Sequence, residues 1–213
     1  MTETAPTPRK VWQEMVRGNT RFVSGEPQHP RQDVERRHEL ATGQKPRAAL
    51  FGCSDSRLAA EIIFDKGLGD LFVVRNAGQV ITDSVVGSLE YAVAVLGVPL
   101  IVVLSHDACG AVAAAIDSTT PEAAALPPNI WRQIAPIVPA VRHVIQSGDG
   151  GQIDAETVGR AHLRNTVTDL LHASELISDA VAEGRVAIVG ANYRLAEGTT
   201  VPEIIVGDVE DAA

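Results

Sequence analysis

The stretch Leu100-Ile101-Val102-Val103-Leu104-Ser105-His106-Asp107-Ala108-Cys109-Gly110 contains the feature that decides the fold. Its first five residues are apolar without polar alternation, which is typical of a strand covered on both faces. Two similar runs precede it in the chain, Ala48-Ala49-Leu50-Phe51 and Leu71-Phe72-Val73-Val74. The three runs predict buried strands of a parallel sheet.

Helical periodicity separates these runs and continues after them. Ser84 to Leu96 is expected to form a helix, with Asp83 as its N-cap and Gly97 as its stop. Farther on we expect a helical stretch from about Ala155 to Ala182, a strand at Val186 to Val189 and an edge strand at Glu203 to Val206. Strands that alternate with helices indicate an α/β fold, with a mainly parallel central sheet of about four strands flanked by helices.

The N-terminal part of the chain is different in kind. Residues 1–10 are expected to form a disordered or loosely docked arm, and Val11 to Val23 fits an amphipathic helix. Glu26 to Gln44 is polar with scattered prolines, as expected of a surface segment. Two later segments, Asp117 to Asn129 and Ser147 to Gln152, are expected to be irregular. We predict one domain over residues 1–213, with an arm and surface segment at 1–45 and the α/β core at 46–213.

The composition excludes several classes of protein. Of the 213 residues, 45% are hydrophobic and 21% are charged, which argues against a disordered chain. A net charge of −9 makes nucleic acid or an anionic membrane an improbable partner, because both select for basic surfaces. The opening MTETAPTPRK lacks the apolar core of a secretory signal, and the most apolar stretch is too short to span a bilayer. A cytoplasmic, soluble protein is therefore expected.

Both cysteines of the chain follow predicted strands. Cys53 lies in Phe51-Gly52-Cys53-Ser54-Asp55-Ser56-Arg57, directly after the first strand, and His106 and Cys109 follow the third. The carboxyl ends of parallel strands meet at one edge of a sheet, where ligands of α/β proteins bind. Two thiolates and one imidazole suit zinc, and an open fourth position is typical of a catalytic zinc site. Water or Asp55 is a candidate for that fourth position.

Each of these residues also has a plainer interpretation. A lone cysteine after a strand is more often part of the core, and the spacing H-x-x-C is a weak motif by itself. The joint pattern favours a metal site, because Asp55 and Arg57 are costly to bury in such a turn unless they pair with each other or with a ligand. The remaining histidines are expected in the polar segment or on helical surfaces and interfaces: His29, His38, His143, His162 and His172.

Taken together, C-x-D-x-R (Cys53, Asp55, Arg57) and H-x-x-C (His106, Cys109) closely resemble the signature of the β-class carbonic anhydrases. The resemblance extends from about Val11 to the last strand. Its further matches are Gly18-Asn19, Arg21-Phe22, Phe72-Val73-Val74-Arg75-Asn76 and Glu90-Tyr91-Ala92-Val93.

The resemblance implies reversible hydration of CO2 to bicarbonate and a proton by a zinc-bound hydroxide, with one Zn²⁺ per subunit. Cys53, His106 and Cys109 would be the zinc ligands. Asp55, oriented by Arg57, would accept a hydrogen bond from the nucleophile, or would become the fourth ligand in a closed, inactive state. The residues that the resemblance places around the substrate are Gln44, Phe72, Ala77, Tyr91 and Gly110.

The resemblance also implies an assembly. Part of each pocket would come from a partner subunit, so a homodimer or homotetramer is expected. The family fold has a parallel sheet with an antiparallel edge strand, and an N-terminal helical arm that embraces the partner. An arm of this kind would explain an amphipathic helix at Val11 to Val23 that is detached from the core.

Two positions depart from the family pattern. Ser105 stands where glycine usually precedes the ligand histidine. Either the family uses glycine there for its backbone freedom or for close approach, or the serine hydroxyl tunes a zinc ligand by a hydrogen bond. Leu50 stands where some bacterial members have a tryptophan of a non-catalytic bicarbonate site, so that site is expected to be absent although Arg75 is kept.

Two alternatives to carbonic anhydrase activity are considered. The same zinc chemistry would serve a relative that hydrolyses COS or CS2, and paired assays would separate the two activities. A non-catalytic zinc or thiol-redox protein is the other alternative, but such a protein has no use for an Asp55–Arg57 pair beside an open metal site.

Overall fold

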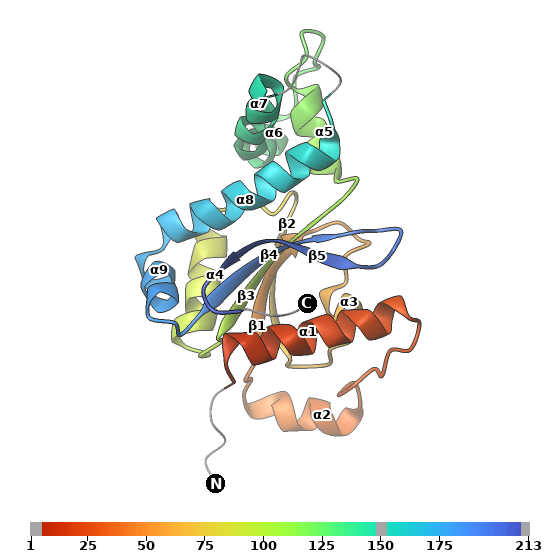
Figure 1. Cartoon of the computed structure of the whole chain (residues 1–213), viewed down its shortest axis with the longest axis vertical. Coiled ribbons are helices and arrows are strands. Elements are labelled where there is room, and N and C mark those ends of the chain that lie inside the picture. The colour runs from red at the N-terminus through yellow and green to blue at the C-terminus, as the bar shows by residue number, and fades with distance from the viewer. Residues whose placement is uncertain (1–5, 148–152, 210–213) are drawn as a thin grey trace.

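The computed structural model describes residues 6–147 and 153–209, which fold around one five-stranded sheet (Figure 1). The strands lie in the order β2-β1-β3-β4-β5. The first four are parallel, and β5 runs antiparallel to β4, which confirms the α/β class and the antiparallel edge strand. Their bounds are β1 Ala48–Cys53, β2 Leu71–Asn76, β3 Leu100–His106, β4 Ala187–Tyr193 and β5 Thr200–Val206.

Helices cover both faces of the sheet. Helices α4, α8 and α9 pack on one face, α1 and α3 lie on the other, and α5 to α7 project beyond the ends of the strands (Figure 1). The α-helices are α1 Pro8–Val23, α2 Val34–Glu39, α3 Ala60–Ile63, α4 Asp83–Ala94, α5 Gly110–Asp117, α6 Pro128–Ile134, α7 Val138–Ser147, α8 Ala155–Ala173 and α9 Glu175–Ala182. Two 3₁₀ turns complete them, Leu40–Thr42 and Ala135–Ile137.

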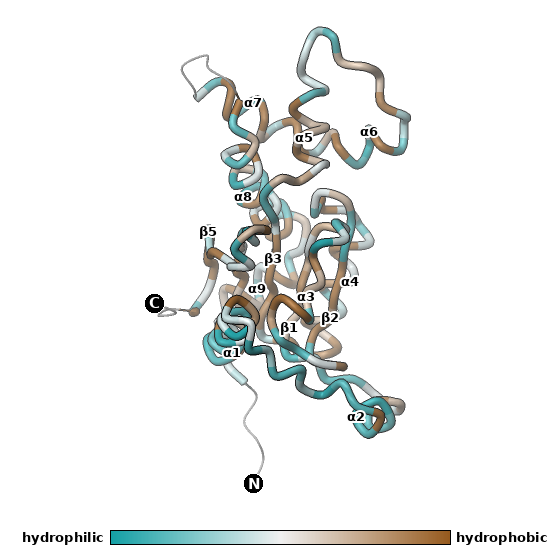
Figure 2. The backbone as a smooth tube through the Cα atoms, turned by 90° about the vertical axis from the view of Figure 1, so that its right-hand side faces the viewer, coloured by the Kyte–Doolittle hydropathy of each residue, from teal (hydrophilic) through white to brown (hydrophobic). Residues whose placement is uncertain are grey.

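The core explains why the runs of β1 and β3 lack polar alternation, whereas β2, also expected to be buried, is only half-buried. Every residue of β1 and β3 is buried, and alternate side chains enter the two separate apolar clusters on either side of the sheet. Leu50 and Val102 point into one cluster, whereas Phe51 and Val103 point into the other. In Figure 2 the strands form the hydrophobic centre of the molecule, and α2 is hydrophilic. A strand buried on both faces has no position for an exposed polar residue.

The stretch from Ala155 to Ala182, predicted as one continuous helical stretch, forms two helices, α8 and α9, so the prediction of continuity is wrong. Ser174 interrupts it with an extended backbone, φ −134° and ψ 103°. The Ser174 hydroxyl accepts a hydrogen bond from the Ile177 N–H at 3.1 Å, which caps α9, and lies 2.6 Å from the Glu90 carboxylate of α4. A serine that caps a new helix competes with continuation of the old one.

Other boundaries also differ from the prediction. Thr82, not Asp83, is the N-cap of α4, because its hydroxyl accepts from the Val85 N–H at 3.4 Å and Asp83 is already helical. The polar segment at 26–44 contains α2 and a 3₁₀ turn, and α3, α6 and α7 were not predicted. Residues 118–127 are largely irregular, as expected. Of the second segment expected to be irregular, residues 148–152 lie outside the described residues.

Helix α1 is not detached from the core, which corrects the expectation of a free arm. It begins at Pro8, and Val11, Trp12 and Met15 are at most 1% exposed within the cluster that also holds Leu50. The apolar face of the helix therefore packs on its own chain.

The Gly18-Asn19 match has a structural reason. A Cβ on Gly18 would lie 1.9 Å from the Phe64 carbonyl oxygen, so only glycine permits this approach. Asn19 is buried and donates to the carbonyls of Ile63 at 3.1 Å and Gly198 at 2.8 Å. Its own side-chain oxygen accepts from the Thr200 N–H at 2.9 Å. These contacts fix α1 to the end of α3 and to the start of β5.

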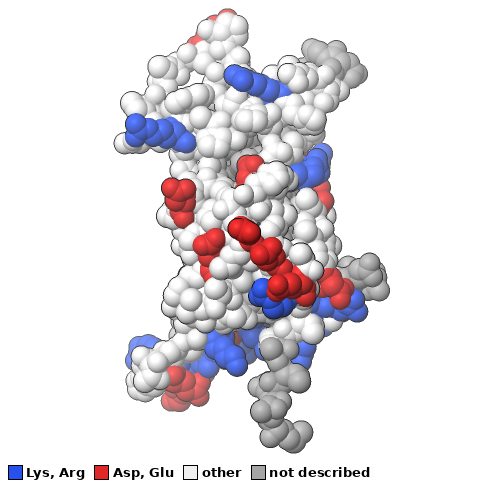
Figure 3. Space-filling model, turned by 90° about the vertical axis from the view of Figure 1, so that its left-hand side faces the viewer, with Lys and Arg blue, Asp and Glu red and all other residues white. Residues whose placement is uncertain are grey.

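The hydropathy of the helices and the charge of the surface describe the molecule further. Among the described residues, no helix is long and apolar enough to cross a membrane. The face shown in Figure 3 has acidic side chains grouped over its middle, with basic side chains above and below them.

Candidate metal centre

The carboxyl ends of β1 and β3 bring the three candidate ligands together. Cys53 ends β1, His106 ends the neighbouring β3, and Cys109 follows at the start of α5. The intervening turn is tight, because Ala108 has a positive φ of 47°. The Sγ atoms of the two cysteines and a ring nitrogen of His106 all lie within 4.8 Å of one another. Tetrahedral zinc holds N and S ligands roughly 3.5–3.8 Å apart, so a small contraction would complete the site.

The histidine ring is oriented for metal binding. Nδ1 of His106 lies 2.7 Å from the Asp107 carbonyl oxygen, so Nδ1 carries the proton and donates. Nε2 is then left with its lone pair, and it is buried without a hydrogen-bond partner among the described residues. A buried polar atom without a partner is costly, and a metal ion would satisfy it. The donor set therefore fits zinc.

The two thiols are coupled when no metal is bound. A hydrogen bond from Cys109 lowers the pKa of the Cys53 thiol to about 4, helped by His106 and by the Gly78 N–H, which lies 3.3 Å from its Sγ. The neighbouring Cys53 thiolate and burial raise the pKa of Cys109. One proton is thus shared between two buried sulfurs, and a divalent cation would replace it.

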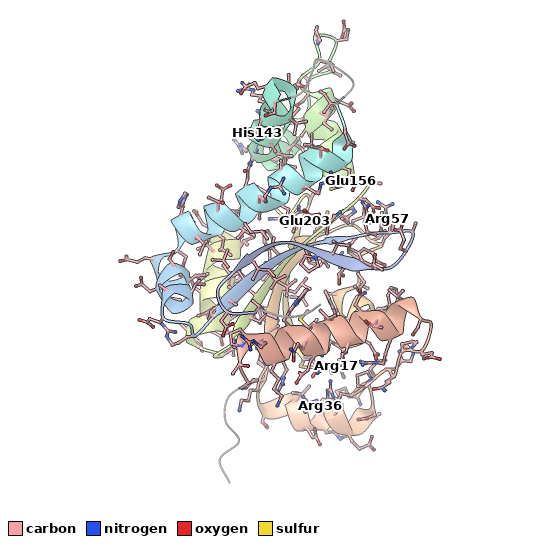
Figure 4. All side chains as sticks on the ribbon, in the orientation of Figure 1. Arg17, Arg36, Arg57, His143, Glu156 and Glu203 are labelled. Carbon is pink, nitrogen blue, oxygen red and sulfur yellow. The ribbon has the colours of Figure 1, made fainter. Side chains whose placement is uncertain are left out.

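Asp55 and Arg57 form a pair beside the ligands. Arg57 donates from Nε to Asp55 Oδ1 at 2.9 Å and from Nη2 to Oδ2 at 2.7 Å. These hydrogen bonds hold the pKa of Asp55 below its usual range. Oδ2 of Asp55 lies 3.9 Å from Nε2 of His106, so the carboxylate borders the metal position. Figure 4 shows Arg57 below Glu156 of α8, and Arg36 on α2 far from both.

Several contacts around the site were not predicted from the sequence. Arg57 also donates to the Ala108 carbonyl at 3.2 Å, which joins the two ligand turns. Arg75 donates to the carbonyls of Cys53 at 2.9 Å and Asp55 at 2.5 Å. Asp107 accepts from the backbone N–H of Leu195 at 3.0 Å. The sequence signal for Arg75 was its place in the run Phe72 to Asn76, which resembles the family and lies within β2. Its partners are backbone carbonyls, and these leave no signal in the sequence.

The Ser105 hydroxyl does not contact a zinc ligand, contrary to one expectation. Ser105 and His106 are neighbours on β3, so their side chains point to opposite faces of the sheet. Ser105 donates to Asn192 Oδ1 at 3.0 Å, and Asn192 is its register partner on β4. The serine is 2% exposed and satisfied by this neighbour.

The expected substrate residues fall into two groups. Ala77 directly follows Asn76, the register partner of Cys53, and Gly110 directly follows Cys109, so both adjoin the ligands. Gln44, in contrast, precedes β1, and a strand of this length separates its two ends by about 17 Å.

Phe72 and Tyr91 also belong to the distant group. Phe72 pairs with Ala49 near the amino end of β1, and its ring centroid lies 6.2 Å from that of Tyr91 on α4. Tyr91 is 46% exposed. One chain therefore brings together the candidate ligands, Asp55 and Arg57, but not the whole expected pocket.

Fold and site together define the class as an α/β metalloprotein with a buried Cys-His-Cys zinc site. A family model described as carbonic anhydrase matches residues 48–200. Carbonic anhydrase 2 of Mycobacterium tuberculosis is 47% identical over 206 residues, which cover 95% of this chain and 96% of that protein. The carbonic anhydrase of Mycolicibacterium smegmatis is 44% identical over 202 residues, with coverages of 95% and 96%.

Solved structures agree with these matches. A tetrameric β-carbonic anhydrase of Sordaria macrospora superposes with a TM-score of 0.68 at 26% identity, over 78% of this chain and 84% of that one. The β-carbonic anhydrase CafA of Aspergillus fumigatus gives a TM-score of 0.67 at 25% identity, over 91% and 88% of the two chains. The chain belongs to the β-class carbonic anhydrase family.

Proposed function

We propose that this protein catalyses the reversible hydration of CO2 to bicarbonate and a proton, with zinc held by Cys53, His106 and Cys109. The observation that carries the proposal is the buried His106: its Nε2 has no hydrogen-bond partner among the described residues, and its ring places a nitrogen within 4.8 Å of two cysteine sulfurs. When bound there, zinc would supply the hydroxide, because it lowers the pKa of water. The rest of the chemistry belongs to residues of this chain.

Asp55 orients the attacking water. Arg57 keeps the carboxylate ionised, and an ionised carboxylate only accepts hydrogen bonds. It therefore selects a water or hydroxide whose O–H points toward it, which leaves a lone pair free to attack carbon. If Asp55 rotated to become the fourth metal ligand, both hydrogen bonds from Arg57 would break. A carboxylate bound to the metal would also take the place of the attacking water, so the arrangement with Asp55 on Arg57 is the active one.

A partner subunit completes the pocket. Among the described residues, β2 has no strand partner on its outer edge, and four apolar side chains of this strand are only half-buried. Twofold pairing of two such edges is isologous, and it would place the amino end of one β2 beside the carboxyl end of the other. Gln44, Phe72 and Tyr91 would then approach the partner's zinc.

The assembly follows from this pairing. The working unit is a homodimer, and the tetrameric Sordaria macrospora relative is consistent with further association of such dimers. We place the protein in the cytoplasm, where its two free cysteine thiols remain reduced and available to zinc.

Paired assays test the function. Zinc-loaded protein should hydrate CO2 in a stopped-flow assay, and Cys109→Ala should lose both zinc and activity. Stoichiometric zinc in Cys109→Ala would overturn the ligand assignment. A zinc-loaded wild-type protein without CO2 hydration would overturn the proposed reaction.

A further inference from the structure

A histidine on the far side of the metal centre is held in a specific orientation. His162 of α8 is 3% exposed, and its Nε2 lies 2.7 Å from the Gly78 carbonyl oxygen. A carbonyl only accepts, so Nε2 carries the proton and donates. Burial lowers the pKa of His162, which keeps the ring neutral. Its Nδ1 has no hydrogen-bond partner among the described residues.

The residue that His162 contacts is itself bonded to a metal ligand. The backbone N–H of Gly78 points at Cys53 Sγ at 3.3 Å. Gly78 has a φ of +80°, and an added Cβ would lie 2.9 Å from both Ala111 and Ile137. Helix α5 and the 3₁₀ turn Ala135–Ile137 thus confine Gly78 from one side, while α8 holds its carbonyl from the other.

The neighbouring peptide is anchored to the same helix. The Thr166 hydroxyl lies 3.4 Å from the Gln79 carbonyl and 2.9 Å from the His162 carbonyl, one turn back along α8. Gln79 is 1% exposed and has a positive φ of 41°, which is unfavourable for a residue with a side chain. Such a turn keeps its conformation only where its surroundings fix it.

The N–H to sulfur contact has a chemical consequence. A thiolate that accepts a hydrogen bond holds its charge more tightly and donates less of it to a metal. The metal then remains more electron-poor and acidifies water more strongly. The strength of this hydrogen bond depends on where the Gly78 N–H points, and the Gly78 carbonyl is fixed by His162.

We propose that His162 is a positioning residue for Cys53: through its hydrogen bond to the Gly78 carbonyl it aims the Gly78 N–H at the ligand sulfur. This inference rests on the zinc carbonic anhydrase function proposed above. The competing explanation is that His162 merely satisfies a buried carbonyl and contributes only to stability. The two explanations differ in what happens at the sulfur.

Substitution of His162 separates the explanations. His162→Ala removes the donor, and His162→Gln keeps an N–H at a similar reach. His172→Ala removes an exposed histidine from the same helix as a control. Leu163→Ala matches the loss of stability, because Leu163 is fully buried on α8 but does not hydrogen-bond to the Gly78 turn.

Three readouts report on the sulfur. The first is the sulfur-to-cobalt charge-transfer band of the Co²⁺-substituted protein, which His162→Ala should move to longer wavelength. The second is zinc affinity by chelator competition. It should fall about tenfold, in the range seen for residues that support metal ligands, because the sulfur loses the contact that holds it in position and this loss outweighs its greater charge donation. The third is the pH midpoint of CO2 hydration, which should rise.

His162→Gln should restore all three readouts toward wild type, and Leu163→Ala and His172→Ala should leave them unchanged. The proposal is overturned if His162→Ala lowers the melting temperature but keeps the cobalt band and zinc affinity of wild type. If His162→Ala does not fold, His162→Gln is compared with wild type directly. A folded His162→Gln whose cobalt band differs from that of wild type then overturns the proposal. An inactive wild-type protein would instead refute the proposed function, because the band and the affinity are measured without turnover.

Discussion

Arg57 holds Asp55 in its ionised form, and this residue pair yields the first prediction. Asp55→Asn keeps the shape of the side chain but adds an N–H donor and removes the charge. Zinc content should stay at one per subunit, and kcat should fall by about 10- to 100-fold, as for other residues that support a metal site. Metal analysis and stopped-flow CO2 hydration measure the two quantities. Loss of zinc in this variant would contradict the assigned role.

The lowered pKa of Asp55 also determines how stability depends on pH. A carboxyl whose folded pKa lies below the ordinary value of 3.8 contributes stability that is fully present above that value. The contribution is lost as the pH falls toward the folded pKa. The difference in free energy of unfolding between wild type and Asp55→Asn should therefore be constant from pH 6 to 9, whereas it should shrink in strong acid.

Ser105 is next to the candidate ligand His106 in the sequence but does not contact it, and a substitution tests this. Ser105→Ala leaves Asn192 Oδ1 buried without its donor, so the free energy of unfolding should fall by about 1–3 kcal/mol. Zinc affinity and kcat should match wild type. Urea unfolding and CO2 hydration check the two statements. A lower kcat at unchanged stability would show that the Ser105 hydroxyl acts on the metal site after all.

At the residue scale, the sequence sufficed where function uses side chains at strand ends. Cys53, His106 and Cys109 were found because buried strands precede them and parallel strands end at one edge. The role of Gly78 was not visible, because its donor is a backbone N–H. His162 was assigned to a helical surface or interface, and only the packing of α8 against the Gly78 turn shows its contact.

Among the elements, α1 yields a stability prediction opposite in sign to the one expected from helix propensity alone. Alanine is about 1 kcal/mol better than glycine inside a helix. Gly18→Ala should nevertheless destabilise the protein by about 1–3 kcal/mol, because its Cβ would meet the Phe64 carbonyl. Gly87→Ala on α4, where no heavy atom lies within 4 Å of the added Cβ, should stabilise it instead. Equal stabilisation by both, measured by urea unfolding, would refute the packing of α1 on α3.

The elements also show where sequence patterns stop being informative. Strands β1, β3 and β4 were predicted because burial on both faces removes polar residues from them. Strand β2 was predicted from its apolar run, although its side chains are only half-buried in one chain. The break between α8 and α9 was missed, because apolar periodicity continues through Ser174 while its hydroxyl caps a new helix. Short helices such as α3 and α6 bury too few residues for a periodic pattern, so packing decides them.

For the whole molecule, an active site built from residues of two subunits predicts that two inactive variants restore activity when they form a heterodimer. A Cys109→Ala subunit lacks zinc but keeps Gln44 and Tyr91, and a Tyr91→Ala subunit keeps zinc. Each homodimer should be nearly inactive. A heterodimer purified through two different tags should contain one complete site, and so about half of the wild-type activity. Heterodimers no more active than their parents would show that Tyr91 acts within its own subunit, or not at all.

The most direct test of the central claim is the pH profile of CO2 hydration by the fully zinc-loaded protein. Two thiolates neutralise the charge of zinc, so hydroxide should become available only above neutral pH. Because Asp55 stays ionised throughout, the profile should not reflect its titration. We expect activity that rises from pH 6 to 9. A zinc-loaded protein whose activity is absent, or flat across this range, would contradict the account.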